Sequence, residues 1–129
     1  ALGHKVKVVG VVSTHATTYA DSMAAGCVVE APVSTVLADG MAVRRADPQA
    51  LAILQNGLDH LVQVSDAQVA QAMRDLYTDT HNVAEGAGAA SFAAACTERE
   101  QLQGLVVGTT LCGGNVDASV LSQVLQAHA

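Results

Sequence analysis

The sequence predicts an α/β domain with a mostly parallel sheet. Short apolar runs rich in valine, at 6–12, 61–64 and 105–109, alternate with segments that have helical patterns and helix-capping residues. Such alternation is typical of parallel strands joined by helices. Half of the 129 residues are hydrophobic but only 2% are aromatic, so the core must be aliphatic and rich in alanine. Small alanine side chains allow helices to lie close to a sheet.

The first strand is expected at 6–12, which is β-branched and continuously apolar, as in a strand buried on both faces. A helix follows at 17–25 and is ended by Gly26, a residue favoured just after a helix. Residues 38–40 (Ala-Asp-Gly) read as a turn, and 41–43 as a short extended piece.

The second helix has a clear start signal, because Asp47 can cap it and Pro48 fits its first position. We expect it to run to about Asn56 and to end at Gly57. A strand at 61–64 comes next.

Ser65 is placed to cap the third helix, which is expected at 66–77. A helix of small residues is expected at 89–96, and the last long strand at 105–109. The last helix is expected at 118–127. The whole of 1–129 is predicted to be a single domain, since there is no repeat or low-complexity linker.

Charge and composition exclude several classes of protein. The formal net charge of −6 and the lack of a basic patch with aromatics argue against a nucleic-acid partner. No apolar run is long enough for a membrane span, so no membrane association is expected. The three cysteines, Cys27, Cys96 and Cys112, have no zinc-type spacing and are expected to be reduced thiols in a cytoplasmic protein.

Four stretches stand in order along the chain: Val-Val-Gly-Val at 8–11, Ala-Asp-Gly-Met-Ala-Val at 38–43, Ala-Glu-Gly-Ala-Gly-Ala at 84–89, and Cys-Gly-Gly-Asn at 112–115. Together they resemble the second half of the threonine/serine dehydratases, the fold-type II pyridoxal-phosphate (PLP) family that also includes serine racemase. The resemblance implies a three-layer α/β/α fold, incomplete at its N-terminus, and pyridoxal 5'-phosphate as the cofactor.

The resemblance also implies cofactor-binding roles for Cys112, Glu85, Gly40, Gly113 and Asn115. Cys112 matches the Ser or Cys position that faces the pyridine nitrogen, although a buried structural cysteine is the alternative. Glu85 matches the position beside the cofactor ring; it is expected to have a partner or to interact with a helix dipole. Gly40 borders the site or forms a plain turn. Asn115 lines the cofactor wall or caps the last helix.

A divalent-cation site is not expected. Serine racemase-like members use a Glu, an Ala carbonyl and an Asp, whereas the aligned residues here are Val12, Ala16 and Thr18. Hard cations prefer charged oxygen ligands, and both carboxylates are replaced. The five histidines show no metal-ligand spacing. We therefore predict no metal site and, on this chain, no catalytic residue.

For the parent protein the resemblance implies a PLP-dependent threonine or serine ammonia-lyase (dehydratase) giving a 2-oxo acid and ammonia. The Schiff-base lysine and the phosphate loop of the family have no counterpart here, so the isolated chain is expected to be inactive and to bind PLP weakly. An amino-acid substrate and either a homo-oligomer or a missing N-terminal half are the expected partners.

Three other functions stay open at this stage. One is a PLP-dependent racemase of the same family. Another is a non-catalytic interaction or dimerisation module, whose incomplete sheet is completed by another chain. The third is a nucleotide-binding domain that uses Gly86 and Gly88 at a helix start, although a third glycine is lacking.

Overall fold

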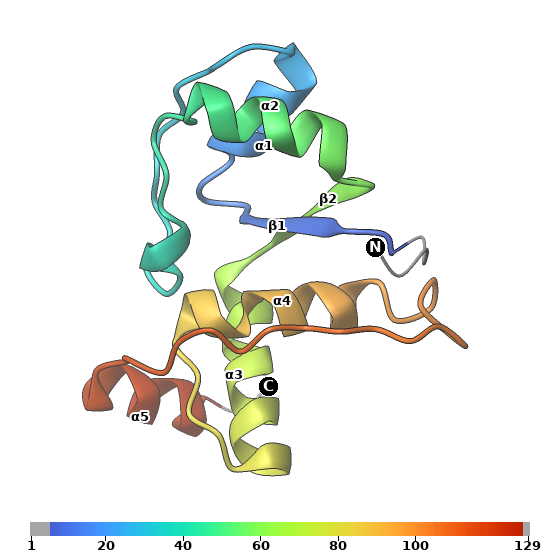
Figure 1. The fold of residues 1–129 in the computed structure, drawn as a ribbon. Coiled ribbons are helices and arrows are strands. Elements are labelled where there is room, and N and C mark those ends of the chain that lie inside the picture. Colours follow the sequence, from blue (N-terminus) through green and yellow to red (C-terminus); the bar gives the residue numbers. More distant parts are fainter. Residues whose placement is uncertain (1–5, 128–129) are drawn as a thin grey trace.

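The computed structural model describes residues 6–127 (Figure 1). Two strands, five α-helices and one 3-10 helix lie within this range. In chain order they are β1 (Val9–Ser13), α1 (Thr18–Ala25), η1 (Asp39–Met41), α2 (Pro48–Gly57), β2 (His60–Val64), α3 (Asp66–Thr80), α4 (Gly86–Thr97) and α5 (Ala118–Gln126).

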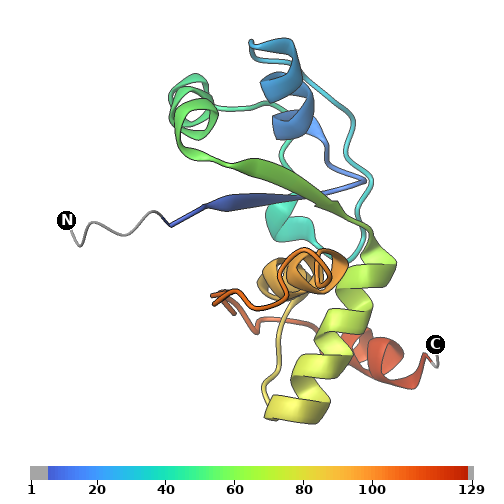
Figure 2. The ribbon, with the colours of Figure 1, turned by 90° about the vertical axis from the view of Figure 1, so that its right-hand side faces the viewer.

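The two strands form a parallel sheet between two helical layers. Val9 pairs with His60 and Ser13 with Val64, so the strands are in register over their full length. Helices α1 and α2 cover one face, and α4 lies against the other with α3 beside it (Figures 1 and 2). The predicted three-layer α/β/α fold with a parallel sheet is confirmed.

Local capping signals are placed as the sequence predicts. The Asp47 carboxylate accepts hydrogen bonds from the N–H groups of Gln49 and Ala50 at the start of α2. Ser65 and Gln68 form a reciprocal capping box at the start of α3. Gly26 ends α1 with a φ of 69°, a left-handed conformation that costs glycine little.

Several predicted boundaries were wrong. Residues 41–43 are not an extended piece: Met41 ends η1, and the Val43 N–H donates to the Met41 carbonyl oxygen at 2.9 Å in a tight turn. Within η1, the Asp39 carboxylate accepts from the Gly40 N–H at 2.8 Å. Helix α2 includes Gly57, and Leu58 follows it in extended conformation. Helix α4 begins at Gly86, three residues earlier than predicted, because two glycines are accommodated in its closely packed first turn.

The predicted strand at 105–109 is the main correction. No strand is assigned there, and Leu105, Val106 and Val107 are exposed. Within residues 6–127 the sheet has only β1 and β2, so this apolar run has no described strand to pair with. An apolar run predicts burial only where another part of the protein covers it.

The core lies between α3, α4 and the sheet. Met73 and Val69 of α3 and Val64 of β2 are fully buried in it, together with a row of alanines on α4. Arg74 ties α3 to α5, since its guanidinium donates to the Val124 carbonyl oxygen at 3.0 Å. The aliphatic, alanine-rich core that the composition predicts is therefore observed.

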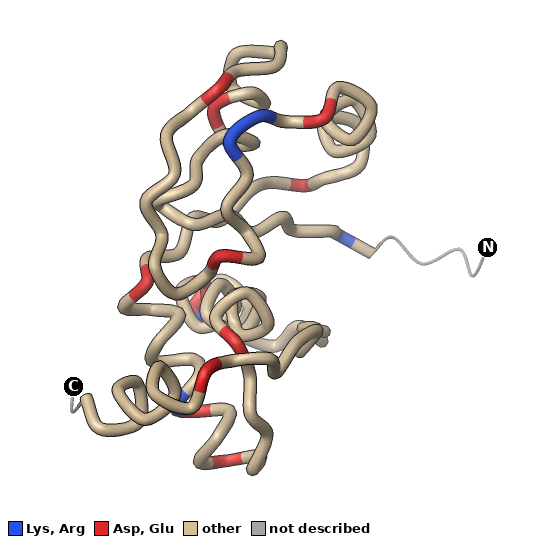
Figure 3. Tube along the Cα trace, turned by 90° about the vertical axis from the view of Figure 1, so that its left-hand side faces the viewer, with Lys and Arg blue, Asp and Glu red and all other residues tan. Residues whose placement is uncertain are grey.

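The charge of the chain is spread over its whole length. Figure 3 shows Asp and Glu on segments throughout the described trace, with only a few positions for Lys and Arg. Among the described residues, no helix has both the length and the apolar character that a membrane crossing requires.

Candidate functional site

Three segments far apart in the sequence meet at the first turn of α4. The backbone of Leu37 approaches Gly86, and the backbone of Gly113 approaches Gly88, so closely that a Cβ on either helix glycine would overlap the facing carbonyl oxygen. Only glycine permits this distance, because it has no Cβ. The glycines of the Glu-Gly-Ala-Gly motif thus bring the loop before η1 and the 112–115 motif to the same helix end.

Glu85 is the N-cap residue of α4 and joins two of the predicted motifs. Its N–H donates to the Gly113 carbonyl oxygen at 2.9 Å, and its carboxylate lies against the Gly113 backbone. The carboxylate makes no capping bond and no hydrogen bond or ion pair with another residue of the range 6–127, so the expected partner for this half-buried acid was not found there. The helix dipole favours its negative charge at this position.

Cys112 directly precedes Gly113 and is exposed among the described residues. Gly40 also lies at this junction: a Cβ added there would be 3.0 Å from the Cβ of Ala87 in the first turn of α4. Three predicted positions, Gly40, Glu85 and Gly113, are thereby brought together, with Cys112 adjacent to them.

Asn115 is the fifth predicted residue and lies in an exposed turn after Gly114. The prediction that it caps the last helix was wrong, because Asp117 is the N-cap residue of α5. Within residues 6–127 no hydrogen bond holds its side chain. Its predicted cofactor role stays a prediction, as do those of the other four residues.

Sequence reasoning missed the residues that hold the two loops in place. The Ser91 hydroxyl of α4 donates to the Thr110 carbonyl oxygen at 2.8 Å and fixes the approach to the 112–115 motif. The Asp66 carboxylate accepts from the Thr35 hydroxyl at 2.6 Å and from the Val36 N–H at 3.0 Å, which orders the loop before η1. These contacts join residues distant in sequence, so no local pattern could have indicated them.

The positions aligned with a family cation site run from Val12 in β1 to Thr18, the first residue of α1. Ala16 and Thr18 are buried, and the Thr18 hydroxyl has no hydrogen-bond partner in the described range. Among residues 6–127, no three His, Cys, Asp or Glu side chains are grouped so that they could hold a metal ion. The absence of a cation stays a prediction.

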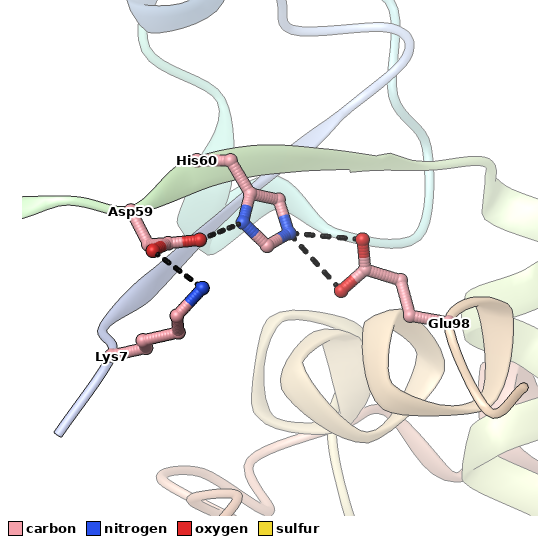
Figure 4. A network of polar contacts seen from close by, with 4 residues as sticks. All are labelled: Lys7, Asp59, His60 and Glu98. Atoms are coloured by element: carbon pink, nitrogen blue, oxygen red, sulfur yellow. Dashed lines mark hydrogen bonds and ion pairs between the residues drawn. The ribbon is translucent and has the colours of Figure 1, made fainter. Parts of the chain in front are cut away.

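A second polar cluster links the start of β2 to the C-terminal end of α4 (Figure 4). His60 Nδ1 lies 2.9 Å from Asp59 Oδ2, and Nε2 lies 2.9 Å from Glu98 Oε1. Lys7 Nζ contacts the other oxygen of Asp59 at 3.0 Å. Hydrogen bonds to Asp59 and then Glu98 raise the pKa of His60, and hydrogen bonds to His60 and then Lys7 lower the pKa of Asp59.

Comparison with known proteins decides the family. Residues 1–113 match the family described as "Pyridoxal-phosphate dependent enzyme". The chain belongs to this family. The match covers three of the four predicted motifs in full and confirms the resemblance on which their interpretation depends.

Several of the similar proteins are threonine ammonia-lyases or threonine deaminases. An L-threonine ammonia-lyase of Geobacter sulfurreducens is 34% identical over 122 residues, which are 94% of this chain and 30% of that protein. A T.th. threonine deaminase superposes with a TM-score of 0.81 at 30% identity, covering 90% of this chain and 42% of that one. The processed threonine deaminase isoform 2 of Solanum lycopersicum superposes with a TM-score of 0.88 at 26% identity, covering 95% of this chain and 34% of that one.

The chain spans about a third of the length of the curated relatives that it matches. The residues present fit one wall of a site for pyridoxal phosphate. An exposed thiol at Cys112, a weak hydrogen-bond donor, stands beside a wall of close-packed backbone at Gly88 and Gly113. The donor type suits the ring nitrogen of the cofactor.

Proposed function

We propose that this chain forms the cofactor-facing wall of a PLP-dependent ammonia-lyase that converts threonine or serine to a 2-oxo acid and ammonia. The observation that carries the proposal is the meeting of Gly40, Glu85 and Gly113 at one helix end, with Cys112 exposed beside them. The names of the similar proteins, L-threonine ammonia-lyase and threonine deaminase, support the substrate class.

Cys112 has the most specific role in this proposal. When bound, pyridoxal phosphate supplies a sink for the electron pair left on the substrate Cα after its proton is lost. A thiol donates only weakly to the pyridine nitrogen and leaves it unprotonated, whereas an aspartate would hold a proton there. An unprotonated ring is a weaker sink, which favours loss of a β-hydroxyl over transamination.

Glu85 and the glycines position Cys112. The bond from the Glu85 N–H to the Gly113 carbonyl oxygen fixes the residue that follows the thiol, and Gly88 allows that backbone to lie directly on α4. The Glu85 carboxylate holds negative charge near the positive end of the α4 dipole. Gly40 and Asn115 complete the wall on either side of this junction.

Groups outside this wall are needed for turnover in the proposed reaction. We infer that the isolated chain binds PLP weakly and does not turn over threonine, and that the active form is a longer polypeptide or a homo-oligomer. We also infer a cytoplasmic location, which the three unpaired cysteines support.

The proposal is tested with a chimera, in which residues 1–129 replace the aligned segment of the Geobacter sulfurreducens L-threonine ammonia-lyase. We expect ammonia and 2-oxo acid from threonine or serine. Cys112→Ser should retain this activity, and Cys112→Asp should lower kcat/KM about tenfold or more. A chimera that is folded and retains PLP but releases no ammonia would contradict the proposal, and D-serine formation without ammonia would indicate a racemase.

The 129-residue chain alone provides the matched control. With PLP added, its ammonia release from threonine should equal that of its own Cys112→Ala variant. Turnover above that variant would show that this chain holds a complete site, contrary to the proposal.

A further inference from the structure

Residues 30–45 form one loop whose two ends are joined. Glu30 and Arg45 form an isolated antiparallel bridge, and their side chains pair at 2.6 Å. Between these ends the chain contains η1, which lies against α4 (Figure 1). Compact loops whose ends lie close together are frequently functional. This loop brings Gly40 to the first turn of α4.

Asp66 holds the loop from outside. Its Oδ1 accepts from the Thr35 hydroxyl at 2.6 Å, and its Oδ2 accepts from the Val36 N–H at 3.0 Å. The Thr35 hydroxyl in turn accepts from the Ala38 N–H at 3.1 Å. Hydrogen bonds to a carboxylate are about twice as strong as those between neutral groups. One side chain therefore fixes a whole turn of the loop.

The fixed turn adjoins both contacts of the loop with α4. Leu37 lies between the two bonded N–H groups, and its carbonyl oxygen faces Gly86 so closely that a Cβ there would overlap it. Ala38 is fully buried, and its carbonyl oxygen accepts from the Met41 N–H at 2.9 Å, which starts η1. Gly40 of η1 makes the second contact with α4. Movement of the turn would therefore displace both contacts.

Stabilisation of α3 alone is the simpler role for an acid at this position. Asp66 is the first residue of α3, where the helix dipole favours a negative charge. However, Ser65 and Gln68 already cap this helix in a reciprocal capping box. Among the described residues, both oxygens of Asp66 accept from the loop and neither accepts from an N–H of α3. The geometry favours a role toward the loop, with α3 as its support.

We propose that Asp66 and Thr35 are positioning residues for the cofactor wall, holding the 30–45 loop so that Gly40 stays against α4. This inference rests on the proposed function, which gives that wall its role in binding PLP. Both residues act through the backbone of the loop and not on the substrate. Loss of either one should therefore loosen η1 and weaken the binding of PLP.

The first measurement is hydrogen–deuterium exchange of the full 129-residue chain. Thr35→Val keeps the shape of the side chain and removes the hydroxyl, while Asp66→Asn leaves one acceptor oxygen of two. Exchange is followed at the amides of Met41 and Ala42, which are bonded within η1 and to neither changed residue. Each variant should speed it about tenfold. The double variant should lie within about twofold of the singles, because all three break one link.

Asp21→Asn is the matched control. Asp21 lies in the first turn of α1 and also accepts from a threonine hydroxyl, that of Thr17, at 2.7 Å. Its helix and its partner both lie outside the 30–45 loop. Exchange at the amides of Met41 and Ala42 should stay within about twofold of the wild type.

The second measurement is the Kd for PLP of the chimera described above, obtained by titration of its apo form. Thr35→Val and Asp66→Asn should each raise this Kd about tenfold, the effect of losing about one hydrogen bond. Thr35→Ser keeps the hydroxyl and should restore the Kd to within about twofold, and Asp21→Asn should leave it unchanged. A role in stability alone would lower the melting temperature of the variants and leave the Kd of the folded protein unchanged.

Three results would overturn this proposal while the proposed function stands. They are an unchanged PLP Kd in Thr35→Val and Asp66→Asn of an active chimera, unchanged exchange in η1, and a Thr35→Ser variant that behaves like Thr35→Val. A folded chimera that binds no PLP at all would instead contradict the proposed function, and this inference with it.

Discussion

The two ends of α4 differ in how the segment 105–114 lies against them. At the first turn, Gly88 lets the Gly113 backbone touch the helix, and Glu85 binds it through a hydrogen bond. Near the last turn, Val106 and Val107 stand exposed beside a groove. One end is closed by backbone contact within the chain, and the other is lined by apolar side chains without a described partner. The closed end therefore carries the candidate site.

Small and large residues of the two ends have different structural roles. Glycines at the closed end remove side chains so that three loops can share one helix terminus. Leu105, Val106 and Val107 at the open end keep apolar surface exposed among the described residues.

The largest effect on stability is expected at the closed end of α4. Gly88→Ala would place a Cβ into the Gly113 carbonyl oxygen, and the facing group is backbone, which cannot rotate away. We expect the free energy of unfolding in urea to fall by about 3 kcal/mol, near the upper end of the usual cost of overpacking.

Gly57→Ala is the matched control, because Gly57 is also helical and a Cβ there would meet no atom within 4 Å. It should leave stability unchanged or raise it by about 0.5–1 kcal/mol. Equal effects of the two alanines would mean that the loops do not pack on α4 as described.

A smaller effect is expected where the segment passes from the closed end to the open end. Ser91→Ala removes the hydroxyl that donates to Thr110, and it should lower the unfolding free energy by about 1 kcal/mol. Ser119→Ala, at an exposed position of α5, is the control and should change it by less than about 0.5 kcal/mol. If Ser91→Ala also has no effect, the segment is held by the glycine contacts alone.

The smallest expected effect is a pH dependence of stability that arises from the polar network of Figure 4. Folding raises the pKa of His60 above 6.5, so its contribution to stability is fully present below pH 6.5 and is lost as the pH rises through the raised value. The Asp59 contribution has the opposite sign: its pKa lies below 3.8, so it is present above that pH and lost on acidification through the lowered value.

The melting temperature of His60→Gln should therefore fall further below that of the wild type at about pH 5.5 than at about pH 8.5. Because His60 is exposed, the difference should be small. A deficit that is the same at both pH values, or larger at the alkaline one, would contradict the described network.

Local signals made much of the fold predictable from the sequence. Asp47 and Ser65 cap their helices through bonds two or three residues away, and Gly26 ends its helix by its own backbone freedom. The run at 105–109 was mispredicted as a strand because pairing is a non-local property. The apolar pattern indicates what must be buried but does not specify which polypeptide covers it.

The candidate site was predictable only in part. The four motifs indicated the residues, and the glycines indicated a close approach of backbone. The sequence did not indicate that Gly86 and Gly88 approach Leu37 and Gly113, since these contacts form only in the folded chain. The sequence also suggested a partner for the Glu85 carboxylate, because a carboxylate among small apolar residues is costly to bury alone. The described residues do not supply this partner.

The most direct measurement of the central claim is the absorbance spectrum of PLP bound to the chimera described above. If Cys112 faces the pyridine nitrogen, Cys112→Asp will protonate the ring and shift the cofactor band, while Cys112→Ser will leave the band in place. Identical spectra for the wild type, Cys112→Ser and Cys112→Asp, with PLP retained in all three, would show that the junction at α4 does not form the cofactor wall.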